Sequence, residues 1–414
     1  MIKGIAAIGA LGLLTILCWV VSDPVTPVSL TDEVSQLFGA LGLTGFAAMM
    51  VLSTRWSLLD SLFNGLDKSY VVHKWLGLVS ISLVLVHMFI RLFGLPLAAS
   101  MVGSRVGPGH WGVPSVLLFV GLGLLALLFK RLTYETWKYL HMFMALAYVV
   151  GLAHYYGASS FGALGLAPFS LWLDLMTILG VGSAVYSLFL YERIGFGFHY
   201  RVTGLRPIGQ GNLEITAAPT GRPVDFRAGQ FVFVKIPSRG FPSHPLTISA
   251  PPQADTIQLA VGALGDHTSR LADVIELGDE LRLSRAHGTF DYRRGHPDQI
   301  WIAAGIGITP FRSFLLAGVP QSYSVDFFYS YRGDQAAYLD ELAPLGDNVR
   351  LHLIDTSQES RLTVAKIVEA VSVTGPVDVY FCGPKPMRRA LFGGLKASRL
   401  QVARIHDEEY SFGR

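Results

Sequence analysis

The stretch "HKWLGLVSISLVLVH", residues 73–87, is apolar enough to cross a membrane, yet it begins and ends with a histidine. An imidazole in hydrocarbon is costly unless a partner satisfies it. At about 100° and 1.5 Å per residue, the 14-residue spacing leaves His73 and His87 about 40° from the same helix face and about 21 Å apart. This stretch therefore predicts a membrane helix that presents two polar rings, at two depths, to one neighbouring surface.

A second apolar stretch, "HMFMALAYVVGLAH" at residues 141–154, repeats the arrangement. Its 13-residue spacing leaves His154 about 140° from the face of His141 in a regular helix. A π-bulge or another distortion near Gly151 would correct this phase.

Pairs of imidazoles at two depths are what two stacked b-type haems require, because each iron takes two axial ligands. Any one of these histidines could instead be hydrogen-bonded to a neighbouring carbonyl group. Four matched positions on two parallel helices favour haem ligation, with His73 and His141 near one membrane face and His87 and His154 near the other.

The composition separates the chain into two halves. It has 414 residues, of which 51% are hydrophobic, and a mean hydropathy of +0.43. Residues 1–190 hold only nine of the 33 Lys and Arg residues and seven of the 30 Asp and Glu residues. This imbalance predicts a membrane half followed by a soluble half. The net charge of +3 and the lack of a basic patch argue against a nucleic-acid partner. The two cysteines, Cys18 and Cys382, lie in opposite halves, which excludes a disulfide framework.

The membrane half contains six apolar stretches long enough to span about 30 Å of hydrocarbon. They are residues 4–22, 34–54, 71–93, 113–130, 136–157 and 167–191. The first is interpreted as a retained span, because its apolar run is longer than that of a signal peptide. Loop Lys and Arg residues fall mainly on one side of these spans, which predicts that both termini are cytoplasmic in a multi-pass cell membrane protein. The Gly- and Pro-rich residues 94–112 would form an outer loop.

The soluble half changes character twice. From about residue 198, short alternating stretches between Gly and Pro turns predict a small antiparallel β-barrel. From about residue 299, strand, glycine turn and helix alternate, which predicts an α/β domain with a parallel sheet. The expected architecture is a six-span haem bundle (1–191), an antiparallel barrel (192–297) and an α/β nucleotide-binding domain (298–414).

Two short motifs in the α/β part point to a dinucleotide. "GIGITP", residues 305–310, lies between a strand and a helix, where Gly305 and Gly307 would let the backbone approach a pyrophosphate at a helix N-terminus. "CGP", residues 382–384, follows another strand of the same sheet. Ligands bind at the carboxyl ends of such strands, so the second motif strengthens the first.

Taken together, the motifs of the soluble half resemble the ferredoxin-reductase superfamily of flavin and nicotinamide modules. They are "HPLTIS" (244–249), "GDHTSRL" (265–271), "HGTF" (287–290), "AAGIGITPF" (303–311), "YSYRG" (329–333) and "FCGP" (381–384). Joined to the histidine-bearing spans, the chain resembles the NADPH oxidase and ferric reductase family. It is most similar to the compact bacterial NADPH oxidases, which lack regulatory extensions and partner subunits.

For the flavin, the resemblance implies that Thr247 approaches the N5 edge of FAD and that His244 lies near its pyrophosphate. Pro245 and Leu246 complete this segment, with Leu246 in place of the family's usual aromatic residue. Residues that would meet the FAD phosphates are Gly265, Asp266, His267 and Thr268. The aromatic side chain that stacks on the flavin and yields to nicotinamide would be Tyr410 or Phe412, although a C-terminal aromatic could simply pack on the barrel.

For the nucleotide, the resemblance implies that Arg332 contacts the 2′-phosphate of NADPH, without excluding NADH. The pyrophosphate would lie against the glycine turn, with Gly305, Gly307, Thr309 and Pro310. The nicotinamide would lie near the second motif, with Cys382, Gly383 and Pro384. Cys382 could alternatively be a small buried residue at a strand end.

The activity implied is a relay across the membrane. Electrons would pass from cytoplasmic NADPH through FAD, the inner haem (His73/His141) and the outer haem (His87/His154) to oxygen, producing superoxide on the outer side. Arg91, one turn beyond His87, could bind a haem propionate, favour an anionic product or lie at the membrane interface. The alternatives are a ferric-chelate reductase and an electron-transfer module that feeds a periplasmic protein. Beyond NADPH, oxygen and membrane lipid, no obligatory protein subunit is expected.

Overall fold

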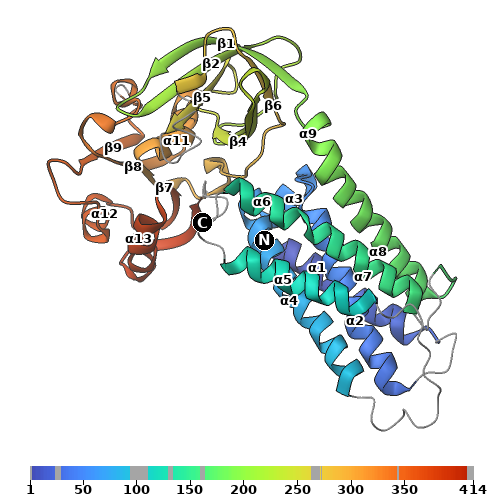
Figure 1. Ribbon diagram of the computed structural model, residues 1–414. Helices are drawn as coiled ribbons and strands as arrows, with labels where there is room; N and C mark the ends of the chain where they lie inside the picture. The colour runs from blue at the N-terminus through green and yellow to red at the C-terminus, as the bar shows by residue number, and fades with distance from the viewer. Residues whose placement is uncertain are drawn as a thin grey trace. The chain divides into compact units, whose positions relative to one another are not determined.

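The computed structural model describes residues 2–23, 29–93, 111–128, 134–158, 164–262, 271, 273–342 and 345–407. The chain divides into two compact units, Met1–Arg193 and Ile194–Phe412 (Figure 1). We call them the membrane unit and the flavin unit. Each contains its own clusters of buried hydrophobic side chains.

The membrane unit is helical throughout its described parts. Four stretches are long and apolar enough to cross a membrane: α1 (Ile2–Val20), α2 (Leu30–Leu52), α4 (Leu66–Phe93), and the run of α8 (Pro168–Val185), the π-helical turn η3 (Tyr186–Leu190) and α9 (Tyr191–Ile194). Helix α5 (Gly112–Leu128) is apolar but shorter. The remaining helices are α3 (Ser57–Phe63), α6 (Tyr134–Met142) and α7 (Met144–Ala158). Four of the six expected spans thus fall on helices long enough to cross a membrane, and the other two fall on α5 and on α6 with α7, which are shorter.

Glycines let α2 and α4 pack closely. A Cβ atom at Gly45 would overlap the Oγ of Ser80, and one at Gly42 would lie 2.6 Å from Cγ2 of Val84. Small residues at such positions allow helix backbones to approach in a membrane, where the hydrophobic effect does not drive helix association. The close packing fixes α4, which carries His73 and His87, against α2.

The fifth expected span is interrupted at Phe143, between α6 and α7. The backbone N–H of Phe143 donates to the carbonyl of Leu140 at 3.2 Å, an i to i−3 bond that tightens the turn. The expected distortion near Gly151 is absent from the described helix, because α7 continues through that residue without a break. The change of phase required by the 13-residue histidine spacing therefore lies near the start of the span.

The first sheet of the flavin unit has six antiparallel strands in the order β4-β3-β6-β1-β2-β5. Its strands are β1 (Phe198–Pro207), β2 (Asn212–Pro219), β3 (Phe231–Ile236), β4 (Phe241–Thr247), β5 (Ile257–Gly262) and β6 (Glu280–Leu283). An isolated bridge between Ile248 and Leu259 connects the two edges of the sheet. Alternate side chains point into a common apolar core, as a sheet with one covered face requires.

The second sheet has five parallel strands in the order β11-β10-β7-β8-β9. They are β7 (Asp298–Ala304), β8 (Ser324–Tyr331), β9 (Val349–Asp355), β10 (Pro376–Cys382) and β11 (Gln401–Asp407). Helix α11 (Thr309–Ala317) packs on one face, while α12 (Val364–Ala370) and α13 (Lys385–Ala397) pack on the other. Short 3₁₀ turns are η4 (Pro237–Arg239), η5 (Tyr292–Arg294), η6 (Gly305–Ile308), η7 (Gly333–Gln335) and η8 (Leu339–Glu341).

The strand order reverses at β7, which has β8 on one side and β10 on the other. In open α/β sheets, ligands bind beyond the carboxyl ends of the strands at such a reversal. The fold therefore places its ligand edge where β7 ends at Ala304 and β10 ends at Cys382.

Candidate functional site

The structure brings the four predicted haem ligands together as two pairs. The ring centres of His73 on α4 and His141 on α6 are 6.0 Å apart, with 61° between the ring planes. Those of His87 on α4 and His154 on α7 are 6.1 Å apart, also with 61° between the planes. The break at Phe143 thus leaves both histidines of the fifth span facing α4.

The separation within each pair fits a single metal ion between the rings. A metal–nitrogen bond of about 2 Å, plus about 1.1 Å from nitrogen to ring centre, places two opposed imidazole centres about 6 Å apart. No group of three or more His, Cys, Asp or Glu side chains able to hold a metal is found among the described residues. A haem needs only two protein ligands, because the porphyrin supplies the other four. The two pairs therefore fit two haem irons.

The two histidines of α4 have acceptors for their outer ring nitrogens. Nδ1 of His73 lies 3.2 Å from the carbonyl oxygen of Met49, and Nδ1 of His87 lies 2.8 Å from that of Ser35. An Nδ1–H group that donates to a backbone carbonyl leaves Nε2 as the ligand atom and fixes the orientation of the ring. Both carbonyls belong to α2, so the close packing of α2 and α4 also sets the angle of these imidazoles.

The two histidines of the fifth span are held differently. Nδ1 of His141 and Nδ1 of His154 are buried and have no hydrogen-bond partner within the described part of the chain. Instead, Trp137 stacks on the ring of His141, with 5.1 Å between centres and 9° between planes. A Cβ atom at Gly112 of α5 would lie 3.0 Å from Cε1 of His154, so a larger residue there would press on this imidazole.

Arg91 forms an ion pair with Asp32 of α2, one helical turn beyond His87. Its guanidinium group is half exposed. The pair ties the end of α4 to the start of α2 beside the second histidine pair. The proposed roles of Arg91 toward a haem or an anionic product stay predictions.

Sequence reasoning missed the setting of Arg55, which it treated only as a loop charge. Nε of Arg55 donates to the hydroxyl of Tyr70 at 2.9 Å, and its guanidinium lies 4.8 Å from the ring centre of Tyr191. Tyr70 is one turn before His73 on α4. No local sequence signal joins these three residues, because they come from distant segments that only the fold brings together.

On the flavin side, Thr247 ends β4 and is only 6% exposed. The side chain of Leu246 packs into the core of the antiparallel sheet, whereas His244 and Pro245 remain partly exposed. The other predicted flavin contacts lie outside the described residues: Gly265, Asp266, His267, Thr268, Tyr410 and Phe412.

On the nucleotide side, the two glycine-bearing motifs meet. A Cβ atom at Gly307 would overlap the carbonyl oxygen of Cys382, and one at Gly383 would lie 3.0 Å from Cβ of Ala304. The hydroxyl of Thr309 donates to the carbonyl of Ile306 at 3.0 Å and closes the turn before α11, whose first turn contains Pro310. The turn after β7 and the turn after β10 therefore form one continuous backbone surface at the strand reversal.

Arg332 is exposed and directly follows β8. Ser330 of β8 pairs with Ala304 of β7, and Cys382 of β10 pairs with Ala303. The carboxyl ends of the three strands are therefore adjacent. A dinucleotide lying along this edge would have the glycine turn at one point and a cationic side chain at another, which fits a phosphate-bearing ligand.

Models of three known protein families match successive parts of the chain. Residues 38–152 match the ferric reductase like transmembrane component, residues 200–294 match an FAD-binding domain, and residues 301–391 match an oxidoreductase NAD-binding domain. The three parts in this order match the NADPH oxidase and ferric reductase family. The first match contains three of the four paired histidines, and the fourth, His154, lies just beyond its end. The third contains both glycine-bearing motifs.

Individual relatives match smaller parts of the chain. The β subunit of a heme-dependent oxidative N-demethylase from Ectopseudomonas mendocina is 30% identical over 193 residues, 45% of this chain and 60% of that protein. Dual oxidase 2 of Rattus norvegicus is 22% identical over 286 residues, 60% of this chain and 18% of that protein. The chain thus spans less than two thirds of each relative. The solved structure of phthalate dioxygenase reductase is 18% identical, with a TM-score of 0.43, covering 51% of this chain and 68% of that one.

Proposed function

We propose that the protein is a transmembrane NADPH oxidase that oxidises cytoplasmic NADPH and reduces oxygen to superoxide on the outer side of a cell membrane. The proposal rests on two histidine pairs at two levels of α4. Their ring centres are 6.0 Å apart in one pair and 6.1 Å apart in the other. Each NADPH gives up a hydride and becomes NADP⁺. Two electrons then cross the membrane singly, two O₂ molecules become two superoxide ions, and one proton remains on the cytoplasmic side.

Bound haem would supply one-electron transfer and bound FAD would convert a two-electron donor into a one-electron one. The chain supplies position and electrostatics. His73 with His141, and His87 with His154, would hold the two irons. The carbonyls of Met49 and Ser35 would keep two of these imidazoles in the tautomer that leaves Nε2 free to ligate.

In the flavin unit, Thr247 would approach the reacting edge of FAD, with His244 near its pyrophosphate. Gly305 and Gly307 would admit the pyrophosphate of the dinucleotide, and Cys382 would lie near its nicotinamide. Arg332 would bind the 2′-phosphate that distinguishes NADPH from NADH. Tyr410 or Phe412 would stack on the flavin, and residues 265–268 would meet its phosphates. We also propose that the first sheet closes as a barrel, which the bridge between Ile248 and Leu259 supports.

The proposal includes six spans with both termini in the cytoplasm, which the loop charges support. Purified in detergent with FAD and haem, the full chain should reduce cytochrome c on addition of NADPH, and superoxide dismutase should abolish that reduction. Absence of a Soret band after expression with ample haem would contradict the proposal, because the two histidine pairs would then not bind haem.

Two other acceptors define the remaining outcomes of this experiment. The match to a ferric reductase like component favours a ferric chelate, in which case turnover would require that chelate and would resist superoxide dismutase. The match to the β subunit of an N-demethylase favours a partner protein, in which case turnover would require an added protein. Either result would replace oxygen as the acceptor and leave the path to the outer histidine pair intact.

A further inference from the structure

The segment that would approach the flavin and the turn that would hold the nucleotide's pyrophosphate are joined directly behind the site. Residues 244–249 end next to Ala250, and residues 305–310 continue into Arg312 and Ser313 of α11. Nη1 of Arg312 donates to the carbonyl of Ser249 at 3.0 Å, and the hydroxyl of Ser313 donates to that of Ala250 at 2.6 Å. These bonds connect the immediate neighbours of the flavin segment to the helix that follows the glycine turn.

Arg312 reaches further into both parts of the flavin unit. From the first sheet, Gln258 accepts a hydrogen bond from its Nη1 at 2.9 Å, and Glu214 lies 3.4 Å from the same nitrogen. From the second, Glu341 accepts one from its Nε at 2.7 Å. Arg312 is only 6% exposed and Glu214 only 2%. One buried guanidinium therefore has ligands in both sheet domains, which its planar fork of donors allows.

The charges around Arg312 balance. Arg206 of β1 pairs with Glu214 at 3.0 Å and with Glu341 at 2.5 Å, so two arginines alternate with two glutamates. The ring of Tyr338 lies 4.3 Å from the guanidinium carbon of Arg312 and 5.6 Å from that of Arg206. Buried ion networks contribute little net stability, because desolvation offsets their attraction, but they tolerate few alternative geometries. This network is therefore better suited to setting the relative orientation of the two sheet domains than to stabilising the fold.

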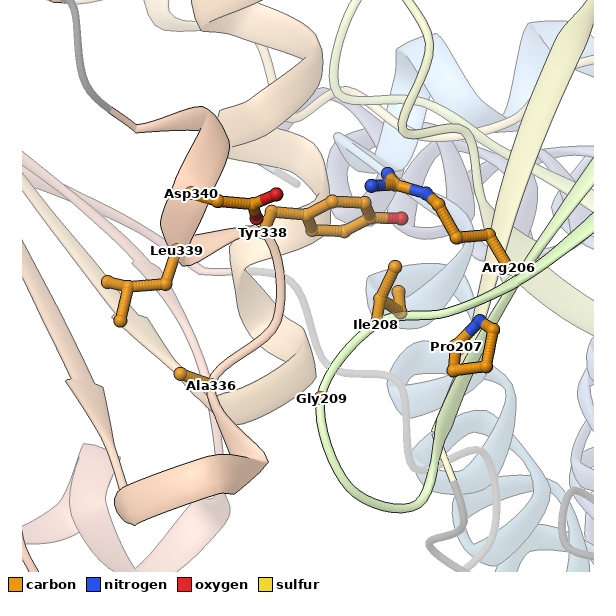
Figure 2. Close-up of a pocket in the computed structure, with 8 residues that line it drawn as sticks. All are labelled: Arg206, Pro207, Ile208, Gly209, Ala336, Tyr338, Leu339 and Asp340. Atoms are coloured by element: carbon orange, nitrogen blue, oxygen red, sulfur yellow. The ribbon is translucent and has the colours of Figure 1, made fainter.

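A cavity lies beside the network. It measures about 410 Å³ and is lined by Arg206, Pro207, Ile208, Gly209, Ala336, Tyr338, Leu339 and Asp340. Figure 2 shows Arg206 pointing toward the ring of Tyr338 across it. At its rim, the backbone N–H of Gln210 donates to the carbonyl of Asp334 at 2.9 Å. Behind this edge, apolar side chains of both sheet domains pack in one buried cluster that includes Ile208 and Phe311. The polar contacts of Arg312 and its neighbours add directional bonds to that packing.

We propose that Arg312 is a positioning residue that fixes the distance between the flavin segment 244–249 and the glycine turn 305–310, and hence between the two rings that exchange hydride. This inference rests on the proposed function. Hydride transfer needs the reacting atoms about 3–3.5 Å apart, and a displacement of about 1 Å can slow such a step about 100-fold. Nucleotide affinity depends on the glycine turn itself and should change little.

The test compares two variants with a matched control in the full-length protein. Arg312→Lys keeps the charge but loses the fork of donors, and Ser313→Ala removes one neutral hydrogen bond. The control is Arg350→Lys, because Arg350 also binds a buried carboxylate through two nitrogens, at 2.8 Å and 2.7 Å from Asp326. That pair lies near the amino ends of β8 and β9, away from the ligand edge.

Anaerobic flavin reduction by NADPH, the deuterium isotope effect on it and the dissociation constant of NADP⁺ are measured for each. Arg312→Lys should slow flavin reduction about 10- to 100-fold and Ser313→Ala about 3- to 10-fold, with the isotope effect increased and NADP⁺ affinity within about threefold of the original. Without any cofactor reaction, amide hydrogens of residues 311–315 should exchange faster in both variants. Arg350→Lys should change none of these quantities.

A defect that lies in FAD content or NADP⁺ affinity instead of the reduction rate would overturn the inference, because Arg312 would then serve only folding or binding. Unchanged reduction in both variants would overturn it as well. If Arg312→Lys cannot be isolated, Ser313→Ala alone decides. Failure of the original protein to reduce its flavin with NADPH or NADH would contradict the proposed function instead, so the two failures are distinguishable.

Discussion

At the scale of single residues, the two histidine pairs differ in what surrounds them. Nδ1 of His87 faces the carbonyl oxygen of Ser35, and its ring pairs with that of His154. His73 and His141 form a second pair at another level of α4. Because the pairs share no side chain, one can be removed without the other. The first prediction follows from this independence.

His87→Leu should remove about half of the Soret absorbance per protein, because one of two axially ligated haems is lost. NADPH should still reduce FAD, because the flavin unit does not contain this residue. Absorption spectra of the purified variant, before and after NADPH, measure both quantities. Met88→Leu, at the adjacent residue of α4, is the control and should keep the full spectrum. Loss of both haems, or of flavin reduction, would contradict the prediction.

A second residue-scale prediction concerns Asp326 in β8, which is only 1% exposed. Burial by itself raises the pKa of this carboxyl group, but hydrogen bonds from Arg350 and His352 outweigh it and hold the pKa below the ordinary value of 3.8. A carboxyl group whose folded pKa is depressed stabilises the fold fully above its unfolded pKa and loses that contribution as pH falls through the folded value. The second sheet should therefore lose stability as the pH falls below about 4.

Asp326→Asn should remove this dependence and lower the stability of the second sheet at pH 7 by about 2–3 kcal/mol, because Arg350 loses its charged partner. Unfolding of the protein followed by the fluorescence of Trp301, in the core of the same sheet, checks both effects. Asp347→Asn is a control, since this carboxylate lies in an exposed turn. A variant that keeps the original loss of stability in acid would show that other groups cause it.

Residue identity and spacing predicted which histidines lie at the same depth, because helical geometry converts sequence distance into depth. The direction of His154 did not follow from its spacing, since it depends on the break at Phe143. The same reasoning could not find Arg312 or Arg55. Their ligands come from segments that are distant in sequence, and nothing in the local pattern distinguishes either arginine from one exposed to solvent. Single charged residues whose role depends on several strands become visible only once the strands are arranged.

At the scale of secondary structure, the break at Phe143 is the element that the sequence did not indicate. Residues 141–150 contain neither glycine nor proline, so local propensity favours an uninterrupted helix. The interruption instead fits the tertiary requirement that both His141 and His154 face α4. The sequence predicts a distortion near Gly151, because glycine is often found at helix irregularities. In the structure this glycine instead allows close packing against α5, since a Cβ atom there would lie 3.0 Å from Oγ of Ser115.

The break makes a third prediction testable. Inserting one alanine between Val149 and Val150 would rotate the rest of α7 by about 100° and turn His154 away from His87. The haem held by His87 should be lost, while the one held by His73 and His141 remains, because both lie before the insertion. Redox titration of the Soret band should show one component instead of two. The same insertion between Leu164 and Gly165, after α7, should leave two, and equal spectra for the two insertions would contradict the role of the break.

At the scale of the whole molecule, charge is distributed unevenly along the sequence, and the structure divides into two compact units close to residue 193. Composition can locate such a boundary, because a membrane unit and a water-soluble unit cover their surfaces with different side chains. The strand order β11-β10-β7-β8-β9 could not be read in the same way. Pairing between β7 and β10 joins residues that are far apart in sequence. Each strand alone is only an apolar run, and its sequence does not specify which strands it pairs with.

The last prediction tests whether the two units are independent in function as well as in folding. The flavin unit has three apolar clusters of its own, so residues 194–414 should fold when expressed alone. This fragment should bind FAD and reduce ferricyanide with NADPH at a rate within about threefold of the full chain, since both reacting segments belong to it. It should show no Soret band, because all four paired histidines lie in the membrane unit. A fragment that binds FAD but is not reduced by NADPH would contradict the prediction, because hydride transfer would then need residues of the membrane unit.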